Sequence, residues 1–344
     1  MSIKKVAVDH AIGMTLGHDV SHVNVTSRKK GVAFKRGHII QEKDIPVFRY
    51  LGKRHVFVWT DGSSEIHEDD VARQVAPMVA GRYIYYDREP AEGKIGFYAK
   101  VNGVFKVDVP RLKRINALAV PSLPTIHNNF PVHRDKQVAA FRIIPLCCEK
   151  EIYENLLAEL EKPLFEVVPY KIKKATIFAT GCEVYEGLVT DDFSPRIARK
   201  LRTFGIDVRD KKILPDACET ISNAIRKSAD KCELLILTGG TSVDPDDVTV
   251  MAMNKAGVLF PQKGNPIQPG NNLTIGYIPA TGTAVCAVPA AALFYDITAL
   301  DVFLPRIVAG ERIPPEEISS FGHGGLCHFC SHCTYPICPF GKCG

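Results

Sequence analysis

Three apolar segments in the second half of the chain constrain its fold more than any other feature. Residues 175–180, 234–238 and 285–288 form apolar runs without polar alternation, which is typical of strands covered on both faces. Helix patterns fill the intervals between these runs, and the links from one element to the next are short. This alternation predicts an α/β domain at about residues 174–310, with a mostly parallel sheet and helices on both faces.

Local patterns predict further elements of this domain. Ser194-Pro195 predicts the start of a helix, because serine is a good helix cap and proline fits the first turn. We also expect strands at 206–214 and 258–260 and helices at 248–256 and 290–300.

The loops that follow the parallel strands are the first candidates for a functional site. In sheets of this kind, ligands bind at the carboxyl ends of the strands. The candidate loops here follow Thr180, Leu214 and Thr238. We therefore expect their polar residues to lie along one edge of the sheet.

The loop after Thr238 has the strongest chemical pattern of the three. Gly239 and Gly240 allow a sharp turn and a close approach to a ligand, and the start of the next helix favours an anionic group. The carboxylates of this loop are suited to Mg²⁺ that bridges to phosphate oxygens. Its hydroxyl and carboxylate residues are Thr241, Ser242, Asp244, Asp246 and Asp247. An ordinary turn with a capping aspartate is the alternative interpretation.

The other two loops each bring a single carboxylate to the same edge. Gly181-Cys182-Glu183 follows the first strand, and Pro215-Asp216 follows the second. Taken alone, Asp216 would be a helix cap and Glu183 a solvated charge. Their interest is that three loops deliver acids to one edge of the sheet.

These residues resemble a known domain. The run from Thr180 to Val184, the later Asp216 and the run from Gly239 to Asp247 are similar to the molybdopterin-binding domain of the molybdopterin molybdenumtransferases. The same domain occurs in molybdopterin adenylyltransferases and in competence-damage-inducible proteins. A shorter segment at 11–20 is similar to the amino-terminal part of the transferases.

The resemblance implies a role in molybdenum cofactor biosynthesis. The chain would bind molybdopterin or its adenylylated form, and Mg²⁺ would assist the insertion of molybdate with release of AMP. Asp247, Asp216 and Glu183 match the family's acids and would be catalytic, with Asp247 also at the metal. The matched positions that would contact the pterin are Thr180, Gly181, Gly239, Gly240, Thr241, Ser242 and Asp244.

Several departures from the family pattern leave two alternatives open. The family's Gly-Asp-Glu is Gly181-Cys182-Glu183 here, and its Pro-Gly-Lys-Pro loop is represented by 267–272, which has no lysine. Its Pro-Gly-Asn-Pro turn is represented by 289–292. The first alternative is a molybdopterin carrier or sensor without catalysis. The second is a hydrolase acting on a nucleotide pyrophosphate.

The end of the chain, 320–344, is predicted to be a cysteine-rich metal-binding tail. Its spacing is C-x2-C-x2-C-x4-C-P, one residue longer than the C-x2-C-x2-C-x3-C-P run of bacterial ferredoxins. An iron–sulfur cluster is the first interpretation, and nearby histidines keep Zn²⁺ open. The expected ligands are Cys327, Cys330, Cys333 and Cys338, with Cys343 as a spare or alternative ligand.

The first half of the chain is less informative. Residues 1–60 are predicted to be a small β-rich unit and residues 61–165 a mixed α+β region. Asn102-Gly103 lies between two strand-like segments and predicts a hairpin, because a type I′ turn needs a positive φ at both positions. Residues 163–174 are expected to be a connector.

Charge and apolar run lengths narrow the partners. The net charge is +5 for 344 residues, so we expect no nucleic acid as a partner. The longest apolar run, 284–295, is too short to span a bilayer, and the first residues do not resemble an export signal. We therefore expect a cytoplasmic protein that does not act at a membrane. A recipient molybdoenzyme or its chaperone stays open as a partner, as does a homodimer.

Overall fold

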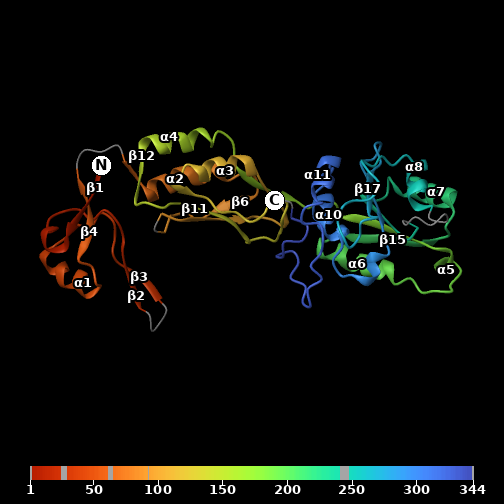
Figure 1. Ribbon diagram of the computed structural model, residues 1–344, viewed down its shortest axis with the longest axis horizontal. Helices are drawn as coiled ribbons and strands as arrows, with labels where there is room; N and C mark the ends of the chain where they lie inside the picture. Colours follow the sequence, from red (N-terminus) through yellow and green to blue (C-terminus); the bar gives the residue numbers. More distant parts are fainter. Residues whose placement is uncertain (1, 25–28, 61–64, 92, 241–247, 343–344) are drawn as a thin grey trace. The chain divides into compact units, whose positions relative to one another are not determined.

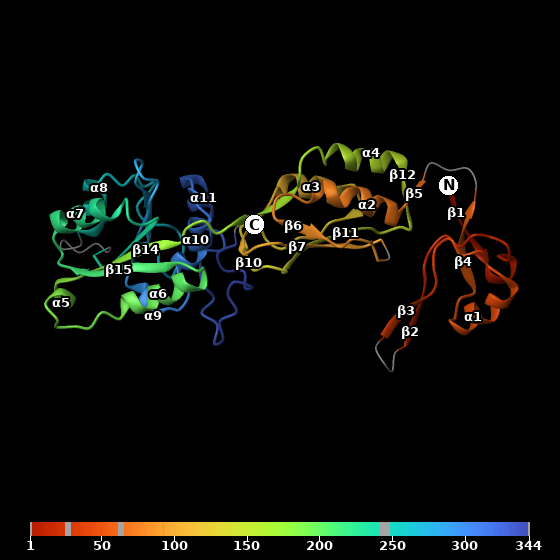
Figure 2. The ribbon, with the colours of Figure 1, turned by 180° about the vertical axis from the view of Figure 1, so that it is seen from behind.

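The computed structural model of the chain describes residues 2–24, 29–60, 65–91, 93–240 and 248–342. The chain divides into two compact units. The first comprises Met1–Val101, Phe105–Asn128 and His133–Val167, and the second comprises Asn102–Val104, Asn129–Val132 and Val168–Gly344. Figures 1 and 2 show the elements of each unit from opposite sides.

The amino-terminal part of the first unit is built from two antiparallel strand pairs. Strand β1 (Ser2–Ala7) pairs with β4 (His55–Thr60), and β2 (Val20–Asn24) pairs with β3 (Lys29–Phe34). Helix α1 (Ile45–Tyr50) lies between β3 and β4 in the sequence and has a proline in its first turn. The side chains of Leu16, Phe48 and Val58 form part of the core of this region.

The elements between residues 65 and 169 combine helices with short strands. The helices are α2 (Glu68–Val79), α3 (Val109–Ala117) and α4 (Lys150–Ala158). The sheets have the strand orders β12-β5, β6-β7-β11-β9 and β10-β8-β13. The strands are β5 (Glu65–His67), β6 (Ile84–Tyr86), β7 (Ile95–Ala99), β8 (Gly103–Val107), β9 (Pro121–Ser122), β10 (Pro131–Val132), β11 (Gln137–Ile143), β12 (Cys147–Glu149) and β13 (Phe165–Pro169).

The hairpin predicted around Asn102-Gly103 is wrong. Strands form on both sides of this pair, but β7 pairs with β6 and β11, whereas β8 belongs to the sheet with β10 and β13. The two strands leave the turn in different sheets because each finds its partner elsewhere in the chain. The expected connector at 163–174 also contains a strand, β13.

The second unit contains a five-stranded sheet of order β15-β14-β16-β18-β17. Strands β14, β15, β16 and β18 are parallel, and β17 is antiparallel to β18. The strands are β14 (Lys174–Thr180), β15 (Asp207–Leu214), β16 (Leu234–Thr238), β17 (Thr274–Tyr277) and β18 (Ala284–Val288). The helices are α5 (Cys182–Tyr185), α6 (Phe193–Thr203), α7 (Cys218–Ser228), α8 (Thr249–Lys255), α9 (Ala291–Phe294), α10 (Ala299–Val308) and α11 (Pro315–Ser320).

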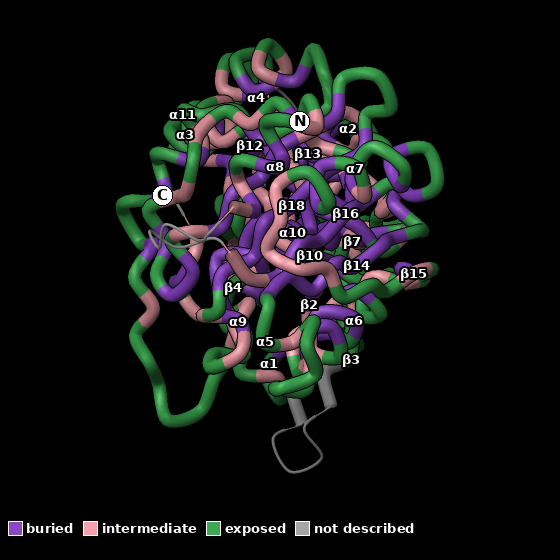
Figure 3. Tube along the Cα trace, turned by 90° about the vertical axis from the view of Figure 1, so that its right-hand side faces the viewer, coloured by how far each residue is buried: buried purple, intermediate pink, exposed green. Residues whose placement is uncertain are grey.

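Helices cover both faces of this sheet, as the apolar strands predict (Figures 1 and 2). Ile236 of β16 packs in the core layer that contains residues of α6 and α10. Its neighbour Leu237 packs in the layer that contains residues of α7 and α8. Strands β16 and β18 are buried along their whole length (Figure 3). The mostly parallel α/β class is therefore confirmed.

Two predicted elements of this unit have different bounds. Residues 258–260 form no strand, and only a single bridge joins Leu259 to Tyr277. The closing helix is split into α9 and α10, because Thr298 has an extended backbone. Thr298 caps α10, and its N–H donates to the carboxylate of Asp301 at 2.8 Å.

Among the described residues, the search for a helix of sufficient length and apolarity to cross a membrane found none.

Candidate functional site

The carboxyl ends of the parallel strands form the expected edge, here called the rim: residues 180–183, 214–216, 239–240 and 288–290. Ala179 of β14 lies beside Thr238 of β16, and Thr238 lies beside Val288 of β18. The strand register thus brings the loops after β14, β16 and β18 to one edge of the sheet. The predicted positions Thr180 and Gly239 are neighbours there.

Hydroxyl hydrogen bonds tie the first and third loops together. The hydroxyl of Thr180 donates to the carbonyl of Thr238 at 3.0 Å and lies 3.3 Å from the hydroxyl of Thr249. The Thr249 hydroxyl donates to the carbonyl of Gly239 at 3.0 Å. Thr249 was not singled out from the sequence. A threonine at the first position of the following helix was the only available signal.

Both glycines of the rim are required by close packing. Gly239 has a φ of +92°, and a Cβ there would lie 2.3 Å from the carbonyl oxygen of Thr180. A Cβ on Gly240 would lie 2.6 Å from the hydroxyl oxygen of Thr249. The two loops therefore approach each other more closely than any side chain would allow.

Asp216 and Gly181 also meet at the rim, as predicted. The N–H of Cys182 donates to the Asp216 carboxylate at 3.0 Å, so Asp216 holds the start of α5. Glu183 is exposed on α5, and its carboxylate oxygens lie 3.0 and 3.1 Å from the place where a Cβ on Gly181 would be. Two carboxylates thus flank the Gly181 turn, one half-buried and one in solvent.

Four predicted site residues lie outside the described residues. Thr241, Ser242, Asp244 and Asp247 belong to the segment 241–247. The structure describes this loop only up to Gly240 and again from Val248, after which α8 begins at Thr249.

The tail cysteines gather around one cavity. Cys327, Cys330, Cys333 and Cys338 all line a cavity of about 650 Å³, and Cys343 lies outside the described residues. Cys327 and Cys338 are half-buried, whereas Cys330 and Cys333 are exposed. The aromatic residues of the cavity wall are Phe294, Tyr295, Phe329, Tyr335 and Phe340.

The backbone turns sharply within the first cysteine pair. Phe329 has a φ of +50°, which is rare for a bulky residue. Its N–H donates to the Cys327 sulfur at 3.4 Å. Hydrogen bonds to sulfur are among the features that tune metal–thiolate centres. Within the described ranges, however, no group of three or more His, Cys, Asp or Glu residues is gathered closely enough to hold a metal ion.

The tail is anchored on the α/β domain by its aromatic residues. Phe340 is 2% exposed and belongs to the core layer of α6 and α10. The Tyr335 hydroxyl donates to the carbonyl of Asp301 at 2.9 Å. The Lys342 ammonium donates to the carbonyl of Cys338 at 2.8 Å. Burial lowers the pKa of Lys342, and the nearby Cys338 thiol opposes this shift.

The loop 265–272 contacts the tail through its backbone. The N–H of Gln268 donates to the carbonyl of Gly325, and the N–H of Cys327 donates to the carbonyl of Gln268, both at 2.8 Å. This loop is the counterpart of the lysine-containing loop of the resembling family. The sequence pattern held no signal that the tail would pair with it.

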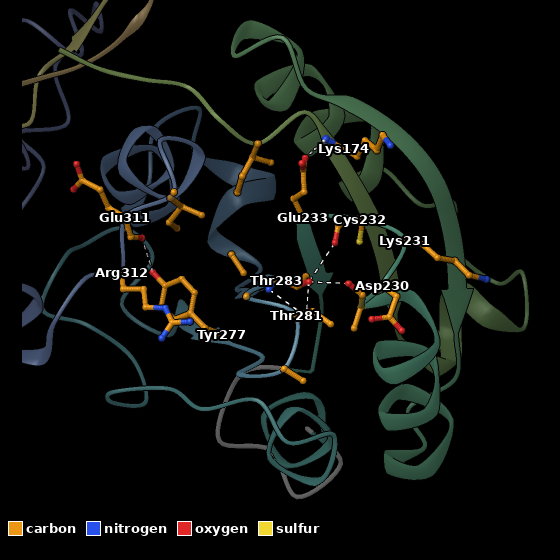
Figure 4. Close-up of a pocket in the computed structure, with 17 residues that line it drawn as sticks. Lys174, Asp230, Lys231, Cys232, Glu233, Tyr277, Thr281, Thr283, Glu311 and Arg312 are labelled. Carbon is orange, nitrogen blue, oxygen red and sulfur yellow. Dashed lines mark hydrogen bonds between the residues drawn. The ribbon is translucent and has the colours of Figure 1, made fainter. Parts of the chain in front are cut away.

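A second cavity, of about 590 Å³, lies at the opposite edge, where the parallel strands begin (Figure 4). The hydroxyl of Thr283 donates to the carbonyls of Ala229 at 2.8 Å and Cys232 at 3.2 Å. The Glu233 carboxylate accepts the N–H of Lys174 at 2.9 Å. These polar groups serve the protein's own backbone, and none of the predicted site residues lines this cavity.

Comparisons with known proteins match two parts of the chain. Residues 176–292 match the model of the family described as "Probable molybdopterin binding domain". Residues 5–60 match a domain family of unknown function. The α/β domain thus carries the sequence pattern of the molybdopterin-binding domain family.

Individual relatives are similar over limited segments. A CinA-like protein of Thermosipho melanesiensis is 39% identical over 84 residues, which is 24% of this chain and 21% of that protein. The matched segment therefore spans about a fifth of that relative's length.

Solved structures with a similar arrangement of elements include two from thermophiles. The molybdopterin biosynthesis enzyme MoaB from Thermus thermophilus has a TM-score of 0.34 and 18% identity, covering 41% of this chain and 98% of that one. A molybdenum cofactor biosynthesis protein from Pyrococcus furiosus has a TM-score of 0.27 and 14% identity. That alignment covers 90% of this chain and 64% of that one.

Proposed function

We propose that the α/β domain binds molybdopterin, or its adenylylated form, at the rim. The observation that carries this proposal is the match of residues 176–292 to the molybdopterin-binding domain family. The rim offers groups suited to such a ligand. Asp216 and Glu183 supply carboxylates that can accept the N–H groups of a pterin, and the glycine turn brings backbone close to a ligand.

The proposed reaction is the insertion of molybdate with release of AMP. Molybdenum–sulfur bonds form to the dithiolene of the pterin, the phosphoanhydride bond breaks, and AMP leaves. Asp247, Asp216 and Glu183 are the proposed catalytic acids, with Asp247 holding Mg²⁺, a hard cation that prefers oxygen ligands. Thr180, Thr241, Ser242 and Asp244 would contact the pterin or its phosphates.

A molybdopterin carrier without catalysis is the second candidate. The loop 265–272 has no lysine to neutralise phosphate or molybdate. The backbone of Gln268 in this loop is bonded instead to the tail. Binding of the pterin tolerates these differences better than transfer of molybdate does.

A binding titration tests the ligand and the site together. Molybdopterin should bind the purified protein in the presence of Mg²⁺, and Asp247→Asn should weaken this binding at least tenfold without lowering the melting temperature. Asp230→Asn is the matched control, because Asp230 lies in the cavity at the opposite edge of the sheet. Equal weakening by both variants, or by neither, would remove Asp247 from the site.

Release of AMP separates the transferase from the carrier. A transferase should release AMP from adenylylated molybdopterin only when molybdate and Mg²⁺ are both present. Tight binding of the pterin without any AMP establishes the carrier instead.

We also propose that the tail holds a metal centre with thiolate ligands. Cys327, Cys330, Cys333 and Cys338 line one cavity, and Cys343 stays an alternative ligand. The size and aromatic wall of this cavity favour an iron–sulfur cluster over a single Zn²⁺, although the described residues show no preformed metal group. Either centre needs deprotonated cysteines, so its loading releases protons.

Metal analysis after anaerobic purification tests the tail. About four iron and four sulfide per chain would establish a cubane cluster, and one zinc per chain would establish a zinc site. Cys330→Ser should lose the metal, whereas Ser331→Ala in the same turn should retain it. Protein that contains neither metal, at full stability, refutes a metal-binding tail.

The remaining parts of the proposal concern organisation and partners. We propose that residues 1–60, 61–165, 174–310 and 320–344 are separate functional segments. A cytoplasmic location, a recipient molybdoenzyme or its chaperone, and a homodimer belong to the same proposal. Size-exclusion chromatography with light scattering tests the homodimer.

A further inference from the structure

The cysteine cavity lies at the same edge of the sheet as the rim. Strand β17 is antiparallel to β18, and its first residue, Thr274, lies opposite Ala287 near the carboxyl end of β18. The loop 265–272, which leads into β17, therefore reaches the edge at which β18 ends. The antiparallel strand brings this loop to the carboxyl ends of the parallel strands.

The tail is bonded directly to this loop. The N–H of Gln268 donates to Gly325, and the N–H of Cys327 donates to Gln268. Cys327 is itself one of the cavity's thiols. The N–H of Ala299, at the start of α10, donates to the carbonyl of Pro269 at 2.9 Å. A displacement of Cys327 would therefore be felt at Gln268 and Pro269.

A second path connects the cavity to the rim through α9. This helix begins two residues after Pro289, which directly follows β18. Its four residues add only about 6 Å along its axis, and its last residue, Phe294, lines the cysteine cavity. The next residue, Tyr295, contacts the ring of Phe329 at 5.8 Å between centroids. Phe329 lies between Cys327 and Cys330.

We infer that loading of the tail metal centre and binding of molybdopterin at the rim are thermodynamically coupled through loop 265–272 and helix α9. The inference rests on the proposed function of both sites. A metal that gathers the four thiols fixes Cys327 and Phe329, and these two residues contact the two segments that enter the rim. A ligand at the rim then binds to segments that are already ordered, which lowers its entropic cost.

Coupling of this kind is reciprocal, which makes it testable in the wild-type protein. Metal-loaded protein should bind molybdopterin about tenfold more tightly than metal-free protein, within the common range of such effects. Molybdopterin should in turn retard the loss of metal to a chelator. Both measurements are made anaerobically on the full chain, and neither depends on catalytic turnover.

A pair of glycine variants tests the route. A Cβ on Gly325 would lie 2.2 Å from the carbonyl oxygen of Phe321 and 2.5 Å from that of Pro266, so Gly325→Ala must push the tail away from the loop. A Cβ on Gly322 would meet its nearest atom at 3.5 Å, an ordinary contact. Gly325→Ala should keep the four thiols but reduce the affinity ratio to about one, and Gly322→Ala should leave the ratio unchanged.

The outcomes separate this inference from the function on which it rests. Molybdopterin binding that is equally tight with and without metal overturns the coupling and leaves the rim site intact. Failure of molybdopterin to bind either form overturns the rim site and the coupling with it. A full affinity ratio in Gly325→Ala also overturns the proposed route. If Gly325→Ala does not fold, the chelator measurement on wild-type protein still decides whether coupling exists.

Discussion

Two glycines of the α/β domain have similar backbone torsions but different surroundings. Gly239 has a φ of +92°, and Gly257 has a φ of +84°. A Cβ on Gly257 would meet nothing within 4 Å, whereas a Cβ on Gly239 would strike the backbone of Thr180. The pair therefore separates the cost of the torsion from the cost of crowding at the rim.

We expect Gly257→Ala to lower the free energy of unfolding by about 1 kcal/mol, the cost of a left-handed torsion for alanine. Gly239→Ala should cost about 3 kcal/mol, because the strand ends must also move apart. Urea unfolding measures both values. Equal costs would mean that the rim relaxes around the methyl group without strain.

At the scale of an element, helix α2 is capped by a histidine. His67 is buried, and its Nδ1 accepts the N–H of Asp69 at 3.1 Å and lies 3.1 Å from the guanidinium of Arg36. Its Nε2 therefore carries the proton and donates to the carbonyl of Gly17 at 3.1 Å. Burial, followed by the charge of Arg36, lowers the pKa of His67.

Acidification should destabilise the unit that contains this cap. Because the folded pKa of His67 lies below the unfolded value of about 6.5, the unfolded state binds more protons in the interval between them. The stability is present above pH 6.5 and is lost as the pH falls through the folded pKa. The free energy of unfolding, measured from pH 7.5 to 5, should show this loss.

A matched pair of variants isolates the histidine. His67→Asn should flatten the pH dependence, because asparagine is also a good helix cap but does not titrate. His127→Asn, at an exposed position of the same unit, should retain the wild-type slope. An unchanged slope in His67→Asn would assign the pH dependence to other groups.

At the scale of the whole molecule, the tail is part of the core of the second unit. Phe340 is 2% exposed and packs in the core layer beside α10. A Cβ on the neighbouring Gly341 would lie 2.6 Å from Val302 of that helix. The last residues therefore contribute to the stability of the α/β domain as well as to the cysteine cavity.

Truncation of one tail side chain should thus destabilise the domain. Phe340→Ala should cost about 3 kcal/mol, as expected for the loss of a buried aromatic ring. Ile337→Ala should change the stability by less than about 0.5 kcal/mol, since Ile337 is 82% exposed. Thermal unfolding of both variants provides the measurement. A neutral Phe340→Ala would show that the tail does not stabilise the domain.

The sequence by itself determined the parallel α/β domain. The strands β14, β16 and β18 were recognisable because burial on both faces requires apolar residues at every position. The convergence of Thr180, Gly181, Asp216 and Gly239 then followed, since the carboxyl ends of parallel strands share an edge. The roles of these residues and the position of the 241–247 loop stay predictions.

Tertiary structure alone decided the features that depend on distant partners. Asn102-Gly103 has the composition of a hairpin turn, yet β7 and β8 join different sheets, because pairing strands compete across the whole chain. The pairing of Gln268 with Cys327 joins segments almost sixty residues apart, and no local pattern encodes it. Thr249 likewise becomes part of the rim only when β14 and β16 lie side by side. Local composition determines which residues can form a strand, a turn or a ligand, but close packing determines which of them meet.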